Sequence, residues 1–175
     1  MTQHNHQTAP TQFVEANGIR FAYRRFGKPG GAPLVFNQHF RGTMDYWDPA
    51  VTDGLARNRE VILFDNAGHF KQFRPGPASV PQMGANAIAF IKALGLAKVD
   101  VLGFSVGGMV AQEITAQAPD LVRRLILVAP GRAAPICQRP ERQRSSPAPT
   151  IRPSIFGLRF TSRRPLRAGP RASPF

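Results

Sequence analysis

The chain has 175 residues, 42% of them hydrophobic, which is enough for one buried core and ordinary for a globular protein. The net charge of +13 is unevenly spread: residues 1–131 carry 13 Lys and Arg against 9 acids, whereas residues 132–175 carry 10 Arg against one acid. The high charge therefore describes the C-terminal tail and says little about the part that folds.

The cysteine content and the polar N-terminus indicate in which cellular compartment the protein is located. Cys137 is the only cysteine, which excludes an intrachain disulfide and a cysteine-cluster metal site and fits a reducing compartment. The first ten residues lack the apolar segment of a secretory signal, and no run is long enough for a membrane span. We therefore predict a cytoplasmic protein. His4 and His6 could bind a metal, but a disordered start over residues 1–11 is the preferred interpretation.

The first half of the chain predicts strands with one short helix between them. Asn17-Gly18 is a strong hairpin signal and joins two β-type runs. Asp48 can cap a helix that has Pro49 at its first position and runs to about Asn58. The expected strands are Thr11–Ala16, Ile19–Phe26, Ala32–Asn37 and Glu60–Phe64.

The second half alternates helix and strand. Ser79-Val-Pro-Gln82 fits a capping box, and the apolar residues that follow have helical spacing until Gly95 ends the helix. The expected elements after it are a strand over Val99–Leu102, a helix over Val106–Ala118 and a strand over Arg124–Ala129. Continuous apolar strands alternating with helices predict an α/β fold with a mostly parallel sheet, opened by the antiparallel hairpin.

The composition changes abruptly after Gly131. Residues 132–175 contain eight prolines and ten arginines and show no sustained apolar period, so we expect a disordered tail. Binding of nucleic acid or of an anionic membrane by this tail is the less favoured alternative, because it has no recognisable nucleic-acid module. Arg, Pro, Ala, Ser and Gly are also what GC-rich DNA encodes in any frame. The tail is thus a candidate for a shifted reading frame, a hypothesis that sequencing of the transcript in all three frames would test.

The motif Gly103-Phe104-Ser105-Val106-Gly107 has the pattern G-x-S-x-G between the expected strand and the expected helix. A serine hydroxyl needs to be held clear of the backbone, near a base and near anion-stabilising donors, to act as a nucleophile. A sharp turn at Ser105 would do this, and the free N–H groups at the start of the helix favour negative charge there.

Residues 12–131 resemble the α/β-hydrolase family. The resemblance rests, in chain order, on the opening hairpin, Asn37-Gln-His-Phe-Arg-Gly-Thr43, Phe64-Asp-Asn-Ala-Gly68, Gly103-Phe-Ser-Val-Gly-Gly108 and Leu125-Ile-Leu-Val128. It implies the N-terminal portion of that fold, with the C-terminal part missing from this chain.

The resemblance also implies site residues. Ser105 is the implied nucleophile, and the backbone N–H groups of Phe40 and Val106 are the implied oxyanion hole. The implied activity is hydrolysis of a small-molecule ester or a related bond through an acyl-enzyme, without a metal or an organic cofactor. The oligomeric state stays open.

The histidine and acid expected after the serine in this family are not evident. The acids that follow Ser105 are Glu113, Asp120 and Glu141, in the predicted helix, at its end and in the tail, and the last histidine is His69. A truncated, inactive relative is therefore the alternative to an active hydrolase.

Several residues near the motif have two interpretations. His39 or His69 could replace the missing base, although loop residues that shape the site are the favoured interpretation of both. Tyr46 and Trp47, near the implied oxyanion loop, could line a pocket, although this is the less favoured interpretation of the two residues. Asp100 is interpreted as a solvated residue at the edge of the sheet.

Overall fold

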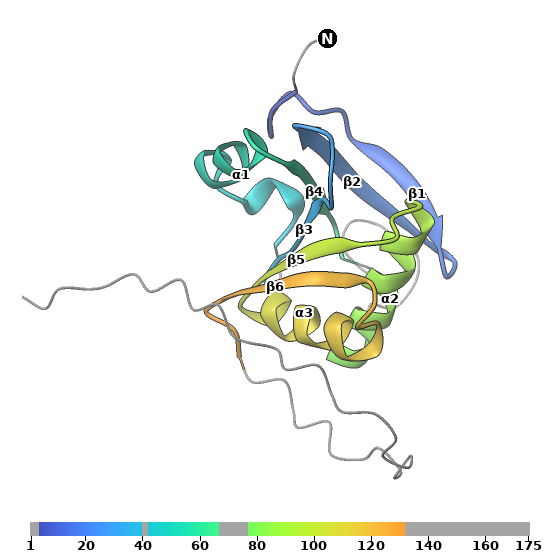
Figure 1. Cartoon of the computed structure of the whole chain (residues 1–175). Helices are drawn as coiled ribbons and strands as arrows, with labels where there is room; N and C mark the ends of the chain where they lie inside the picture. Colours follow the sequence, from blue (N-terminus) through green and yellow to red (C-terminus); the bar gives the residue numbers. More distant parts are fainter. Residues whose placement is uncertain (1–3, 40–41, 67–76, 132–175) are drawn as a thin grey trace, which may run out of the picture. The chain divides into compact units, whose positions relative to one another are not determined.

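The computed structural model of the chain describes residues 4–39, 42–66 and 77–131 (Figure 1). All of these residues belong to one unit, Met1–Cys137, and the second unit, Gln138–Phe175, lies outside the described residues. The predictions made for the tail over residues 132–175 also fall outside the described part of the chain.

The described residues form a single mixed sheet of six strands, in the order β1-β2-β4-β3-β5-β6. Strand β2 pairs antiparallel with β1 and β4, whereas β3 pairs parallel with β4 and β5, and β5 parallel with β6. This arrangement confirms the predicted α/β fold with an antiparallel hairpin at its start. The strands are β1 (Gln12–Ala16), β2 (Ile19–Gly27), β3 (Leu34–Asn37), β4 (Glu60–Phe64), β5 (Val99–Phe104) and β6 (Val122–Val128).

The turn between β1 and β2 has the conformation that the Asn-Gly pair predicts. Asn17 has φ 51° and Gly18 has φ 70°, so both central residues have left-handed backbone, as a two-residue turn of type I′ requires. The register that follows pairs Ala16 with Ile19. The hairpin is therefore specified locally by two residues.

In the part of the chain that the structure describes, three α-helices and one short 3₁₀ helix connect the strands. They are η1 (Met44–Tyr46), α1 (Pro49–Ala56), α2 (Val80–Ala93) and α3 (Val106–Gln117). The predicted caps are present: the Asp48 carboxylate accepts the N–H of Ala50 at 2.8 Å, and the Ser79 hydroxyl accepts that of Gln82 at 3.3 Å. Helix η1 lies between the predicted strand Ala32–Asn37 and the helix predicted from Pro49, where no element was predicted.

Apolar side chains of the central strands alternate between the two faces of the sheet, and each face has its own core. Val35, Ile62 and Val101 pack with residues of α2 and α3. Their strand neighbours, among them Phe36 and Leu63, pack on the other face with residues of η1 and α1. Helices thus cover both faces, as Figure 1 shows, which is why these strands are continuously apolar.

Strand β6 differs from the other parallel strands in its exposure. It lies at the end of the sheet, and its apolar residues Leu125, Ile126, Leu127 and Val128 are 37–43% exposed. A buried strand was expected from its sequence. The strand pairs with β5 on one side only, so in the described part of the chain its other side has no strand partner.

Asp100 is fully buried within β5, which corrects its interpretation as a solvated residue. Its carboxylate accepts hydrogen bonds from the Arg123 guanidinium at 2.8 and 2.9 Å and from Arg59 Nη2 at 2.5 Å. Burial alone would raise the pKa of Asp100, but the hydrogen bonds and charges of Arg123 and Arg59 outweigh it and lower the pKa. The ion pairs connect β5 with β6 and with the residue before β4.

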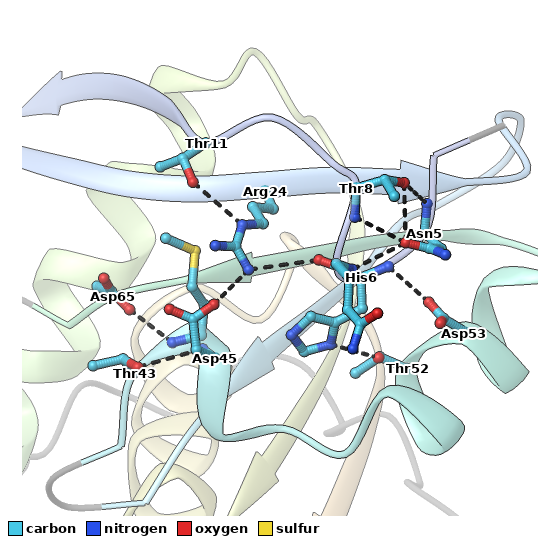
Figure 2. A network of polar contacts seen from close by, with 12 residues as sticks. Asn5, His6, Thr8, Thr11, Arg24, Thr43, Asp45, Thr52, Asp53 and Asp65 are labelled. Carbon is cyan, nitrogen blue, oxygen red and sulfur yellow. Dashed lines mark hydrogen bonds and ion pairs between the residues drawn. The ribbon is translucent and has the colours of Figure 1, made fainter. Parts of the chain in front are cut away.

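The structure describes the N-terminal segment from His4 onward, and within residues 4–11 the side chains of His6 and Ala9 are buried whereas the others are exposed. The disorder expected for residues 1–11 stays a prediction. Figure 2 shows the His6 side chain against α1, where its Nδ1 lies 2.8 Å from the Thr52 hydroxyl, and its backbone N–H donates to Asp53 at 2.8 Å. Burial, and next the positive charge of Arg24, lowers the pKa of His6. The contacts of His6 with Thr52 and Asp53 could not be predicted from neighbouring residues, because they join residues more than 40 positions apart.

Candidate active site

The carboxyl ends of β3, β4 and β5 meet at one edge of the sheet, and the loops that follow them form the candidate site. In parallel α/β sheets this edge is where ligands bind. Asn37 pairs with Gly103 at the ends of β3 and β5, so the loop after β3 lies beside the turn that contains Ser105.

Ser105 occupies a sharp turn between β5 and α3. Its backbone has φ 54° and ψ −122°, a left-handed conformation that is costly for a residue with a side chain. The turn is held by the Ser105 N–H, which donates to Val128 O of β6 at 3.1 Å, and by the Gly108 N–H, which donates to Ser105 O at 2.9 Å. The Ser105 side chain makes no capping hydrogen bond with α3, so its hydroxyl is not engaged there.

The two glycines of the motif allow the backbone segments of this turn to approach closely. A Cβ atom at Gly103 would collide with the backbone of Gly107, and one at Gly107 with the backbone of Asn37. Both glycines are therefore required by the close contact of β5, α3 and the loop after β3.

The predicted oxyanion donors are only partly described. Val106 is the first residue of α3, so its N–H lies among the helix N-terminal groups that have no intrahelical acceptor. Phe40 lies outside the described residues, and so does His69. On either side of residues 40 and 41, the Gly42 N–H donates to His39 O at 3.1 Å, which closes the loop at this point.

Three polar side chains, which the sequence placed only within motifs of the family resemblance, fix the loops of the site. The Gln38 amide donates to Phe64 O at 3.0 Å and the Asn37 amide to Leu102 O at 3.4 Å, while Asp65 accepts the Met44 N–H at 2.7 Å. These bonds join the ends of β3, β4 and β5 to one another and to η1. A signal was available in the sequence, since Asn37 ends a buried apolar strand and Gln38 and Asp65 directly follow one.

Phe104, which directly precedes Ser105, lines a pocket of about 240 Å³, which we call the aromatic pocket. Tyr46 and Trp47 both line it, so the less favoured interpretation of these residues is the one that the structure supports. His39 lies in the same place, with its ring centroid 6.1 Å from that of Phe104. The lining residues are Gln38, His39, Tyr46, Trp47 and Phe104.

Within residues 4–39, 42–66 and 77–131, no three His, Cys, Asp or Glu side chains are grouped as metal ligands would be. In the same ranges, no helix is long and apolar enough to cross a bilayer.

The fold and the serine turn define a class of protein, and comparison with known families agrees. The model of the alpha/beta hydrolase fold family matches residues 32–156, and the chain belongs to this family. The match extends past Gly131 into the segment that the sequence analysis separated as a tail.

Particular relatives are similar over the same region. An alpha/beta hydrolase fold protein from Chitinophaga pinensis is 47% identical with a TM-score of 0.68, over 71% of this chain and 46% of that protein. The dihydrolipoyllysine-residue acetyltransferase component of the acetoin cleaving system of Cupriavidus necator is 35% identical over 124 residues, 70% of this chain and 32% of the relative. A protein of Azorhizobium caulinodans named as carbamate hydrolase RutD is 31% identical over 99 residues, 56% of this chain and 37% of the relative. The chain thus spans about a third of the length of these two curated relatives.

Proposed function

We propose that the protein hydrolyses an ester or a related carbonyl bond through an acyl-enzyme, with the Ser105 hydroxyl as nucleophile. The observation that carries this proposal is the left-handed backbone of Ser105, φ 54°, at a turn between a buried strand and a helix. Such strain at a polar residue is typical of functional sites, and the G-x-S-x-G motif uses it to expose the hydroxyl.

The chemistry proceeds in two steps. Ser105 Oγ attacks the carbonyl carbon, the serine proton passes to the leaving alcohol, and an acyl ester remains on Ser105; water then hydrolyses that ester. The backbone N–H groups of Val106 and Phe40 are proposed to bind the oxyanion of each tetrahedral intermediate. Donors of this kind contribute about 3–4 kcal/mol each to transition-state stabilisation.

The names of the relatives support a carbonyl substrate. Besides the carbamate hydrolase, they include a Haemophilus influenzae protein named as an esterase/lipase and a solved structure titled as an N-acyl homoserine lactone degrading enzyme. Carbamates, esters and lactones all contain a carbonyl bonded to an oxygen or nitrogen leaving group. A nucleophile and an oxyanion hole serve every one of them.

A specific observation favours a second candidate, a chain without turnover. No histidine follows Ser105 in the sequence, and the base that activates the serine in this family comes after it. In such a chain the turn would persist as structure while the hydroxyl stays inactive.

Acylation of the serine separates these candidates. The chain is incubated with p-nitrophenyl acetate, and its peptides are analysed by mass spectrometry. We expect an acetyl group on the peptide that contains Ser105, absent in Ser105→Ala and unchanged in the control Ser79→Ala, whose hydroxyl caps α2. Acetylation that Ser105→Ala leaves unaltered would contradict the proposal and favour the inactive chain.

A further inference from the structure

We propose that the aromatic pocket binds a neutral, planar ring of the substrate, so that the preferred substrates are compact esters that carry one aromatic ring. This proposal deepens the proposed function and depends on it in one respect, that the bound molecule is a substrate. Binding of the ring itself is independent of catalysis, and it is argued from the shape, size and charge of the pocket.

The walls of the pocket present rings at steep angles to one another. The centroid of His39 lies 5.7 Å from that of Tyr46 at 76° and 6.1 Å from that of Phe104 at 85°. The rings of Trp47 and Phe104 lie 6.2 Å apart at 63°. Aromatic rings prefer such edge-to-face contacts, so a flat ring in this space finds both faces and edges to pack against.

These rings come from separate elements that converge beside the serine. His39 follows β3, Tyr46 ends η1, and Phe104 ends β5 directly before Ser105. The Trp47 ring packs against the ring of Phe36 in the core, at a centroid distance of 4.8 Å. A ring held here would contact Phe104, the residue directly before Ser105.

The volume selects the size of the group. A cavity of about 150 Å³ with apolar walls accepts benzene, whereas drug-sized ligands fill about 300–1,000 Å³. The observed volume of about 240 Å³ suits one six-membered ring with a short linking group. A second fused ring or a long alkyl chain would extend out of it.

The charge of the surroundings favours a neutral ring over a quaternary ammonium group, which aromatic walls can also bind. Among the described residues that line the pocket, none is a carboxylate. Asp45, the acid adjacent in sequence to Tyr46, is paired with Arg24 at 2.5 Å. The Gln38 amide already donates to Phe64 O, and its carbonyl oxygen is enclosed, so neither end offers a charge to a cation.

Trp47 provides a direct test, because it is the only tryptophan in the chain. The fluorescence of the Ser105→Ala full-length chain is titrated with methyl benzoate, methyl cyclohexanecarboxylate and choline. We expect a saturable change with methyl benzoate and at least about fivefold weaker binding of the other two. Since this variant has no nucleophile, the result does not depend on turnover; failure of the proposed function would appear separately, as absence of acetyl-Ser105 in the wild type.

A second variant locates the binding. Tyr46 is 70% exposed, so Tyr46→Ala leaves the core intact and is expected to weaken methyl benzoate binding about fivefold. Phe13→Ala removes a ring that is 54% exposed on β1 and should leave the Kd unchanged. The inference is overturned by a titration without saturation, by choline binding as tightly as methyl benzoate, or by a Kd that Tyr46→Ala does not alter.

Discussion

At the scale of single residues, the turn at Ser105 depends on glycines as much as on the serine. At Gly107 a side chain would meet the backbone oxygens of Asn37 and Gln38, which cannot move without separating α3 from β3. We expect Gly107→Ala to lower the free energy of unfolding by about 3 kcal/mol, measured by urea denaturation.

Gly54 is the matched control for this substitution. It lies within α1 with no atom near the position of an added Cβ. Because alanine is the better helix former, Gly54→Ala should raise the free energy of unfolding by up to about 1 kcal/mol. Equal losses in the two variants would show that the close contact at Gly107 is not what requires glycine.

Residue-scale features could be predicted from the sequence where the cause is local. The left-handed pair Asn17-Gly18, the caps at Asp48 and Ser79 and the turn at Ser105 each follow from a few adjacent residues. The buried state of Asp100 could not be predicted in this way, because its partner Arg59 lies 41 positions away. The convergence of the pocket rings was unpredictable for the same reason.

At the scale of elements, the ion pairs of Asp100 hold β6 against β5. Removing the negative charge leaves the partly buried Arg59 without its ion-pair partner, with Ala32 O at 3.2 Å as its other acceptor, whereas Arg123 can turn to solvent because its side chain is 43% exposed. We expect Asp100→Asn to cost about 2 kcal/mol of stability at neutral pH, less than for a fully buried pair. Asp45→Asn, at an exposed carboxylate, should cost less than about 1 kcal/mol.

The contribution of Asp100 to the free energy of unfolding is expected to fall as the pH is lowered. Because the pKa of Asp100 is lowered in the folded chain, its contribution is complete above the unfolded value of about 3.9 and is lost as the pH falls through the folded value. The wild type should therefore lose more stability than Asp100→Asn between neutral pH and the acid limb, as measured by urea midpoints. Parallel acid curves for the two proteins would contradict the shift.

At the scale of the whole molecule, β6 is the surface through which we expect copies of the chain to associate. Four consecutive apolar residues are exposed on a strand that is paired on one side, which is the arrangement that natural sheets protect against self-association. We expect the chain to associate at micromolar concentrations in sedimentation velocity. Ile126→Lys should shift it toward monomer, because a charge on the strand opposes pairing of two edges.

Salt separates this association from one driven by the arginines of residues 132–175. Apolar pairing of β6 should persist or strengthen as salt rises, since residues 1–131 carry only 13 − 9 = +4 and screening removes the repulsion between like-charged copies. Association through the arginines would weaken instead. Val51→Lys, at a 48% exposed position on α1, is the control that adds the same charge elsewhere. A monomeric wild type, or an effect of Val51→Lys equal to that of Ile126→Lys, would rule out β6 as the surface that associates.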